Sequence, residues 1–575
     1  MKLSPVTALA ALSAVLLAAC GTMPAPSASR APALRAATGA PLQSCAALKE
    51  RFAFDQTTLA AATPVTAGTL NQGGKPVPAH CVVTGSMFKR KGSDGRDYAI
   101  GFEMRLPDAW NGRFYYQGNG GLDGNVQPAL GALGGGPITG ALMQGFAVIS
   151  SDAGHSGPQT TFFGMEPQAR LDYGYQAVAK LTPMAKALIA AAYGKSPDRS
   201  YMGGCSNGGR HTMVAAARLG DQYDGYLAGA PGYRLPLAAM NQLWASQQWM
   251  QIATPGATVK HPMNPNAEIA DLGSGFTAQE RQTVAQAVLA KCDALDGVRD
   301  GMVLATQACQ AAFDFQADVP TCGSAGRNGS CLTTAQKTVV SGIFSGSKTR
   351  SGQPIYAAFP YDAGLTSTNW ATWKFVNSLA LDPLAVGTVF SVPPGRVDPL
   401  KEDIDARLPL LHATDAAYRE SGFSLMVPPG QDHPANLAAL HARGAKMVLF
   451  HGVSDAIFSA EDTRQWTLRL DRALGGKGAE FARYYPVPGM NHCNGGPAAD
   501  QFDLLTPLVK WVEQGEAPNS VTAQVRGPGS AAPNPEVPAN WSPTRTRLLC
   551  SYPQVARYNG TGDPESAASF SCAAR

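Results

Sequence analysis

The chain is predicted to have an α/β fold, in which a mostly parallel sheet is flanked by helices. Strand-like and helix-like segments alternate between residues 95 and 230, as they do in βαβ units. The alternation resumes at the strand-like run Lys446–Phe450. Between 234 and 432 it is broken by a stretch with many Pro and Gly residues. We therefore expect a core in two parts, with a large lid inserted between them.

Each part of the core contains short apolar runs that end in turn residues. Tyr175–Tyr193 has apolar residues at helical spacing and predicts a helix, and Arg210–Leu219 predicts another. The expected strands are Phe114–Tyr116, Phe146–Ser150, Ser200–Met202, Lys446–Phe450 and Tyr484–Val487.

The N-terminus has the pattern of an export signal. Lys2 precedes the apolar run Val6–Leu17, which is shorter than the ~20 residues needed to span a bilayer. Cys20 directly follows small residues, as in a bacterial lipobox, so we expect cleavage before Cys20 and its lipidation. An ordinary signal peptide that contains a cysteine is the alternative. The protein would be exported, either as an outer-membrane lipoprotein or as a periplasmic or extracellular protein.

The expected divisions of the chain follow from these patterns. An independent domain with its own function is the alternative for the inserted lid. The divisions are a signal peptide at 1–19, a Pro/Ala/Ser-rich tether at 20–40, the first core part at 41–233, the lid at 234–432 and the second core part at 433–575.

Composition restricts the kinds of partner. Of the 575 residues, 45% are hydrophobic and 15% charged, and the formal net charge is +4. No basic tract indicates nucleic acid, and no further apolar run is long enough to cross a membrane. We expect no nucleic-acid partner and membrane contact only through a lipid at Cys20. The oligomeric state is not indicated by the sequence.

The cysteines indicate an oxidising compartment. Apart from Cys20 there are ten, and an even number in an exported chain predicts five disulfides. Short spacings favour three pairs, proximity at the active site gives a fourth, and the last two cysteines form the fifth. A zinc site is the alternative, but no CxxC or HExxH spacing supports it. The expected pairs are Cys292–Cys309, Cys322–Cys331, Cys550–Cys572, Cys205–Cys493 and Cys45–Cys81.

Ser206 lies in a nucleophile-elbow pattern. Gly204–Gly208 has the form G-x-S-x-G between a strand-like and a helix-like run. A serine nucleophile needs a base within about 2.6–3.2 Å, and His492 stands in a turn-rich loop after a strand. If the two meet, Cys205 and Cys493 also come within the Cα distance of a disulfide, about 4.4–6.8 Å. The two motifs therefore support each other; a structural serine in a glycine-rich turn is the alternative.

The acid of a catalytic triad is expected between these residues in the chain, in the order Ser, Asp or Glu, His. Asp455 is preferred because it closely follows the strand Lys446–Phe450, where a carboxylate would point into the site and hold the imidazole. A plain turn Asp is the alternative role for it. The other candidates are Asp462 and Asp432 for the acid, and His451 and His155 for the base.

Two backbone N–H groups are expected to form an oxyanion hole. One belongs to Asn207, which follows the nucleophile, and the other to the loop Gly120–Gly121, with Gly121 preferred. Such donors contribute about 2.7–4 kcal/mol each in the transition state. A glycine-rich turn without a catalytic role is the alternative.

A second group of polar residues lies at 293–302. Asp293, Asp296 and Asp300 repel one another unless a cation or solvent intervenes, and the two glycines among them let the chain curl. The carbonyls of Val298 and Met302 would then add to an all-oxygen ligand set, which suits Ca²⁺. The spacing is not that of an EF-hand, and a solvated acidic turn is the alternative.

Nearly all of the mature chain resembles the tannase and feruloyl esterase family of α/β-hydrolases. Cysteines beside the serine and the histidine, paired as above, are a hallmark of that family. The matching segments are Gln168–Asp172, Gly204–Arg210, Ala228–Tyr233, Pro488–Cys493 and Tyr552–Tyr558.

The resemblance implies an α/β-hydrolase fold with its lid between the nucleophile and the other triad members. It implies esters of aromatic acids, such as ferulate, gallate or terephthalate monoesters, as small-molecule substrates, and no organic cofactor. By position it implies the triad Ser206, Asp455 and His492 and the oxyanion donors Gly121 and Asn207. It also implies structural calcium in the lid, bound by Asp293, Asp296, Asp300 and the carbonyls of Val298 and Met302.

The pocket departs from the family's terephthalate monoester hydrolases. In those a lid arginine, which follows a tryptophan that Trp373 resembles, binds the free carboxylate of the substrate. Here 375–395 contains no Arg or Lys, while Phe458 matches an aromatic wall of the pocket. Only Lys374 or Arg396 would be near enough in sequence to replace the arginine.

These features are compatible with three functions. A serine esterase for aromatic esters is preferred, and a terephthalate monoester hydrolase proper is its narrower form. A peptidase or acyltransferase on the same fold is the second. A surface lipoprotein that binds aromatic ligands without turnover is the third, and a complete triad argues against it.

Overall fold

The computed structural model describes residues 34–131, 135–136, 140–324 and 326–574. The expected signal peptide, most of the tether and Cys20 lie outside the described residues.

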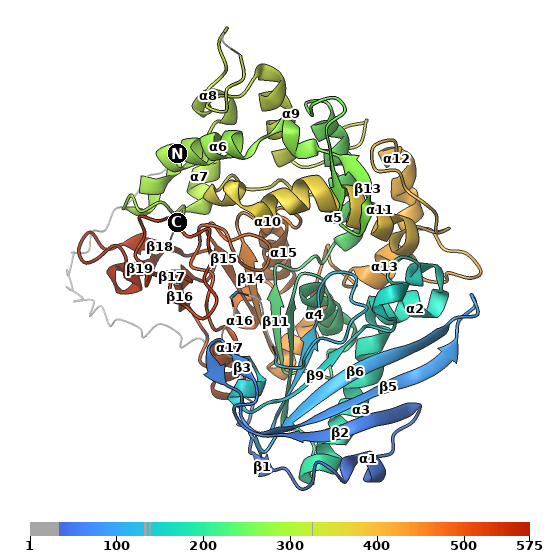
Figure 1. Cartoon of the computed structure of the whole chain (residues 1–575). Helices are drawn as coiled ribbons and strands as arrows, with labels where there is room; N and C mark the ends of the chain where they lie inside the picture. The colour runs from blue at the N-terminus through green and yellow to red at the C-terminus, as the bar shows by residue number, and fades with distance from the viewer. Residues whose placement is uncertain (1–33, 132–134, 137–139, 325, 575) are drawn as a thin grey trace, which may run out of the picture.

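A nine-stranded sheet occupies the centre of the core (Figure 1), in the order β15-β14-β11-β10-β8-β9-β6-β5-β2. The strands from β15 to β9 are parallel, which confirms the predicted α/β class, and β6, β5 and β2 extend the sheet in antiparallel fashion. The parallel strands are β8 (Arg113–Gly118), β9 (Ala147–Ser151), β10 (Arg199–Cys205), β11 (Gly225–Gly229), β14 (Lys446–Gly452) and β15 (Ala482–Val487). The others are β2 (Thr57–Val65), β5 (His80–Lys91) and β6 (Asp97–Pro107).

Helices cover both faces of this sheet because successive residues of a strand point to opposite sides. Met202 of β10 packs in a buried cluster with residues of α3 (Ala177–Tyr193), α4 (Asn207–Arg218) and α15 (Ala460–Ala473). Its neighbour Tyr201 packs in a different cluster, with α17 (Leu505–Gln514). Two predicted helix starts differ from the structure: a π-helical turn, η4 (Asp172–Gln176), precedes α3, and α4 begins at Asn207 instead of Arg210.

The segment from α5 (Leu235–Met250) to α13 (Gly422–Met426) lies above the sheet in Figure 1, with its own large apolar cluster. We refer to this segment as the lid, although its limits stay a prediction. It faces the loops after β14 and β15, to which it is hydrogen-bonded. Its other longer elements are a hairpin, β12 (Thr258–His261) and β13 (Asn264–Ala270), and α6 (Ala278–Cys292), α7 (Thr306–Ala312), α9 (Thr334–Phe344), η8 (Thr372–Asn377), α11 (Ser378–Ala385) and η9 (Val386–Phe390).

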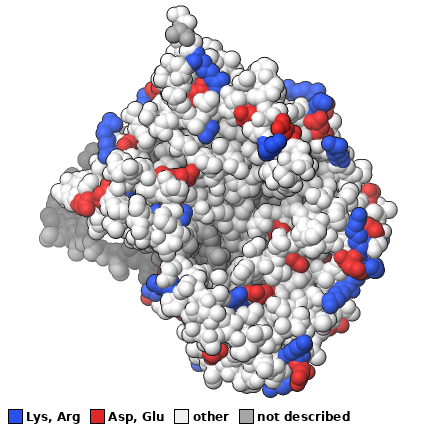
Figure 2. All heavy atoms as spheres, in the orientation of Figure 1, with Lys and Arg blue, Asp and Glu red and all other residues white. Residues whose placement is uncertain are grey.

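The face in Figure 2 is hollowed between the lid and the core. Acidic and basic residues are interspersed, mainly around the rim of this hollow, and most of its floor is uncharged. Within the described residues, no helix combines the length and the apolar character that a membrane crossing requires.

Candidate active site

The nucleophile elbow forms between β10 and α4. Ser206 has φ 66° and ψ −127°, a left-handed backbone that turns its side chain out of the sheet. Its amide donates to Gly229 O (3.0 Å). A Cβ on Gly204 or on Gly208 would stand 2.3 Å from Gly118 O, so the turn closes only with glycine at both positions.

His492 bridges Ser206 and Asp455. Its Nε2 lies 2.8 Å from Ser206 Oγ, and its Nδ1 lies 2.7 Å from Asp455 Oδ2. All three side chains follow the carboxyl ends of parallel strands: β10, β14 and β15. The arrangement has the geometry of a nucleophile, a base and an acid that orients the base.

Asp455 is buried, and burial alone would raise the pKa of its carboxyl. The charges and hydrogen bonds of His492 and His451 outweigh burial and hold this pKa below its ordinary value. The other oxygen, Oδ1, accepts hydrogen bonds from the amides of Ile457 (2.9 Å) and Phe458 (3.0 Å). The acid is thus held in its ionised form, as the role of orienting an imidazole requires.

The alternative triad members have other partners. Asp462 forms an ion pair with Arg234, and Asp432 is exposed. His451 Nε2 lies 3.3 Å from Asp455 Oδ2 and donates to Phe458 O (3.0 Å), while its Nδ1 lies 2.8 Å from Thr463 Oγ1; it has no hydrogen bond to Ser206. His155 is buried against Phe163, and burial lowers the pKa of its imidazole to about 3.

The cysteines pair as the sequence predicts. Cys205 and Cys493, whose Cα atoms are 6.0 Å apart, are joined across 288 positions directly beside Ser206 and His492. The other pairs are Cys45–Cys81, Cys292–Cys309, Cys322–Cys331 and Cys550–Cys572.

One expected oxyanion donor, Asn207, directly follows Ser206, and the other, Gly121, adjoins a glycine that lies close to Ser206. Asn207 is the first residue of α4, where backbone N–H groups have no partner within the helix. The glycine loop is close by, since a Cβ on Gly120 would stand 3.8 Å from Ser206 Cβ. Gly121 has φ +63°, and its carbonyl accepts a hydrogen bond from the Tyr173 hydroxyl (3.1 Å).

The Asn207 side chain is held by two residues that the sequence analysis missed. Its amide nitrogen donates to Asp123, and its oxygen accepts from Nε of the fully buried Arg210 (2.7 Å). Arg210 also donates to the carbonyls of Tyr173 (3.1 Å) and Gly174 (2.5 Å). Arg210 belongs to the Gly204–Arg210 segment that resembles the family. That resemblance was the one sequence signal that could have pointed to its role.

Two aromatic side chains flank the base. The rings of Trp373 and Phe458 stand edge-to-face to the imidazole of His492, with centroids 5.1 and 5.3 Å away. Trp373 comes from the lid element η8 and Phe458 from the loop after β14. The two rings supply an apolar surface beside the nucleophile, suited to an aromatic acyl group.

The two candidates to replace the missing arginine have different surroundings in this structure. Lys374 is buried with its Nζ 3.7 Å from the ring centroid of Phe359, and burial lowers the pKa of its amine to about 7. Its Nζ has no hydrogen-bond partner among the described residues. Arg396 is exposed and lines a separate groove of about 1010 Å³ with residues of β13 and α11.

The loop 293–302 curls as predicted. Asp293 Oδ1 accepts from the amide of Asp300 (3.0 Å), and Asp296 Oδ1 from that of Val298 (3.2 Å). Burial raises the pKa of Asp296 to about 7, and the charge of Asp300 adds to the effect. Buried carboxylates that repel one another fit a cation. Asp300, however, forms an ion pair with Arg547, and the described residues hold no group of three acidic, His or Cys side chains arranged as a metal site.

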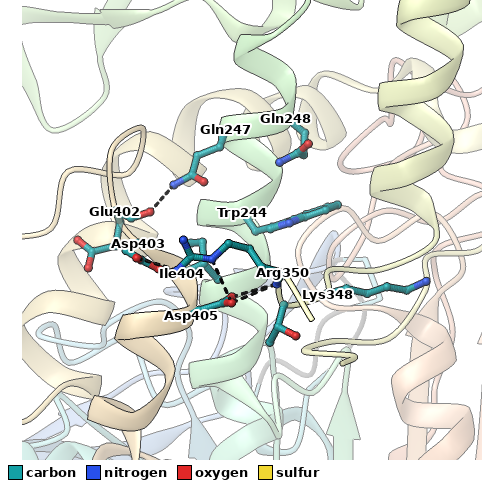
Figure 3. Close-up of a pocket in the computed structure, with 10 residues that line it drawn as sticks. Trp244, Gln247, Gln248, Lys348, Arg350, Glu402, Asp403, Ile404 and Asp405 are labelled. Atoms are coloured by element: carbon teal, nitrogen blue, oxygen red, sulfur yellow. Dashed lines mark hydrogen bonds and ion pairs between the residues drawn. The ribbon is translucent and has the colours of Figure 1, made fainter. Parts of the chain in front are cut away.

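A cavity of about 510 Å³ in the lid (Figure 3) is separate from this site. Trp244 and two glutamines of α5 form one wall. Arg350 reaches across the other side and pairs with Asp403 (2.7 Å) and Asp405 (3.3 Å). None of the triad residues lines the cavity, and three of its charged side chains, Arg350, Asp403 and Asp405, pair with one another.

Comparison with known families gives one match over most of the chain. The model described as tannase and feruloyl esterase matches residues 81–573. Mono(2-hydroxyethyl) terephthalate hydrolase of Piscinibacter sakaiensis is 38% identical over 536 residues, covering 87% of this chain and 85% of its own length. Feruloyl esterase B of Aspergillus niger is 26% identical over 493 residues, covering 82% of this chain and 83% of its own.

A solved structure shows the same fold. The crystal structure of feruloyl esterase B from Aspergillus oryzae superposes with a TM-score of 0.71 at 22% identity, covering 92% of this chain and 99% of that one.

Proposed function

Since the chain belongs to the tannase and feruloyl esterase family and is a carboxylic ester hydrolase of that type, we propose that it cleaves esters of aromatic acids through an acyl-enzyme on Ser206. The observation that carries this proposal is the position of His492, within hydrogen-bond distance of both Ser206 Oγ and Asp455 Oδ2. The aromatic rings beside the imidazole support an aromatic acyl group.

Each group has a defined role at each step of the reaction. His492 Nε2 removes the proton of Ser206 Oγ as that oxygen attacks the ester carbonyl, and Asp455 stabilises the resulting imidazolium. The amides of Gly121 and Asn207 donate to the oxyanion. His492 then gives its proton to the leaving alcohol oxygen, and the C–O bond breaks. A water, deprotonated by His492, attacks the acyl carbon. The bond from that carbon to Ser206 Oγ then breaks, His492 returns the proton to Oγ, and the acid is released.

The acyl group we propose is neutral or phenolic, as in hydroxycinnamate and gallate esters. With no Arg or Lys at 375–395 and Lys374 buried over Phe359, no lid cation faces a second carboxylate on the ring. Burying that carboxylate without a partner costs several kcal/mol. The 38% identity to the Piscinibacter enzyme favours a terephthalate monoester as the second candidate.

An ester panel tests the function. Purified protein is assayed with methyl ferulate, methyl gallate, the terephthalate monoester and p-nitrophenyl acetate, with Ser206→Ala as control. We expect hydrolysis of at least one aromatic ester by the wild-type protein alone. Binding of these compounds without turnover would support the non-catalytic surface lipoprotein instead.

We also propose calcium at the loop 293–302, with Asp293, Asp296, Asp300 and the carbonyls of Val298 and Met302 as ligands. Calcium would screen the repulsion between the buried carboxylates and strengthen the lid. Because Asp300 pairs with Arg547, binding requires the loop to rearrange.

The five disulfides support an exported protein. We propose that Cys20 carries the lipid anchor. Labelling of cells with a clickable fatty acid, with Cys20→Ser as control, tests this; equal labelling of both proteins would contradict it.

A further inference from the structure

A short lid segment, 362–364, lies between the two loops that carry the catalytic acid and base. The Asp362 side chain is fully buried. Its Oδ2 accepts from the hydroxyl of Ser454 (2.8 Å), the residue before Asp455, and from the amide of Gly489 (2.7 Å), in the His492 loop. One lid carboxylate oxygen therefore joins both catalytic loops.

Gly364 extends this contact. Its amide donates to Ser454 Oγ (3.0 Å), and its carbonyl accepts from the Asn491 side chain (3.1 Å). A Cβ on Gly364 would stand 2.5 Å from both Gly489 O and Ser454 Cβ, so the segment fits here only because residue 364 is glycine. The catalytic loops also meet directly, through Ser454 N and Met490 O (3.1 Å), and the lid segment adds to that link.

The second carboxylate oxygen of Asp362, Oδ1, has different surroundings from Oδ2. Oδ1 is buried and has no hydrogen-bond partner among the described residues. A buried carboxylate with one unpaired oxygen is costly, and burial raises the pKa of Asp362 accordingly. An apolar residue would avoid that cost but would leave the amide of Gly489 and the hydroxyl of Ser454 without this acceptor. The carboxylate is therefore explained by its two hydrogen bonds to the catalytic loops.

We propose that Asp362 is a positioning residue, which sets the distance between Asp455 and His492 from the lid side and so couples the seating of the lid to the alignment of the triad. This inference rests on the proposed function of Ser206, His492 and Asp455.

Two substitutions separate positioning from packing. Asp362→Leu keeps the branching at Cγ, replaces both acceptor oxygens with somewhat larger methyl groups and so removes both acceptors. Asp362→Asn can place its oxygen toward Ser454 and Gly489 and its NH₂ toward the unpaired side, and so restores the contact. Glu280→Leu is the matched control. Glu280 is a fully buried lid acid in α6 whose partners, Thr277, Arg327 and Gln336, lie in the lid.

The readouts are kcat and KM with p-nitrophenyl acetate, the rate of inactivation by a fluorophosphonate, and Tm. For Asp362→Leu we expect kcat and the inactivation rate to fall about 10–100-fold, because small misplacements of reacting groups are costly, with KM within about twofold. Asp362→Asn is expected to stay within about threefold of wild type. Glu280→Leu should lower Tm and leave kcat unchanged.

Wild-type kcat in Asp362→Leu, or an equal loss of kcat in Glu280→Leu, would overturn the proposal. If Asp362→Leu shows no cooperative melting, Ser454→Ala replaces it, and an unchanged kcat in that variant would overturn the proposal too. A wild-type protein that no fluorophosphonate labels at Ser206 would instead contradict the proposed function.

Discussion

Ser206 has a left-handed backbone conformation that costs a non-glycine residue about 1–3 kcal/mol. The cost is tolerated because Gly204 and Gly208 allow β10, α4 and Gly118 to approach one another closely. As a result the hydroxyl stands clear of the sheet at the point where His492 reaches it.

Ser206→Ala is expected to lower kcat for aromatic esters by about 10⁴–10⁶-fold, because only the oxyanion donors and substrate binding remain. Steady-state assays check the loss, and equilibrium dialysis with ferulate checks that ligand affinity is kept. A fluorophosphonate should label Ser206 and no other serine. Near-normal turnover by the alanine variant would refute the assignment.

The residues that meet at the candidate site were predictable, and those that hold them were not. Ser206, Asp455 and His492 follow strands and stand in recognisable turns, so local pattern and chain order were enough to bring them together. Asp362 has no local signal, because its role depends on a contact with residues 127 positions away in sequence. Lys374 as a replacement for the missing arginine stays a prediction; in the structure its Nζ is buried over the ring of Phe359.

At the scale of elements, the expected strands correspond to β8, β9, β10, β14 and β15, whereas the parallel strand β11 and the antiparallel strands were not predicted. Strands such as β10 and β14 are buried on both faces and read as apolar runs. The antiparallel strands β2 and β5 mix buried and exposed positions and are interrupted by register shifts, so their pattern is weaker. Cysteine counting succeeded because four of the five pairs are close in sequence.

The Cys205–Cys493 bridge links the elbow to the histidine loop, so its loss should affect catalysis. Replacing both cysteines with alanine is expected to lower kcat about tenfold or more. The matched control replaces Cys322 and Cys331, which close a short lid loop, and should keep kcat near wild type. Equal effects of the two double variants on kcat and Tm would show that the active-site bridge acts only through stability.

Chelation tests the loop 293–302. A ligand that binds only the native state stabilises it by roughly 2.7 kcal/mol at a hundredfold excess over Kd. Tm should therefore fall on addition of EGTA and recover with Ca²⁺ but not with Mg²⁺, and Asp296→Asn should abolish the response. An unchanged melting curve, together with no calcium by elemental analysis, would rule out an exchangeable site.

At the scale of the whole molecule, the core carries Ser206, His492 and Asp455, and the lid carries Trp373 on one side of the imidazole. The break in the α/β pattern predicts where the insertion lies, and its limits stay a prediction. How it sits on the core could not be predicted, because that depends on contacts such as Gly364 against Ser454, which leave no periodic pattern in the sequence.

The expected substrate preference depends on the side chains that the lid contributes to the pocket. Hydroxycinnamate or gallate esters should have a kcat/KM about tenfold or more above that of the terephthalate monoester, equivalent to about 1.4 kcal/mol. Parallel progress curves at low substrate concentration measure the ratio. A preferred terephthalate monoester would contradict the prediction, and Lys374→Met and Arg396→Met would then show which cation binds the carboxylate.

The proposed mechanism requires an acyl-enzyme at Ser206, and mass spectrometry can observe this intermediate. The protein is mixed with methyl ferulate, quenched in acid within milliseconds, digested and analysed. We predict a feruloyl adduct on the peptide that contains Ser206, absent from Ser206→Ala. Turnover of the ester without any adduct, or an adduct on another residue, would contradict the mechanism.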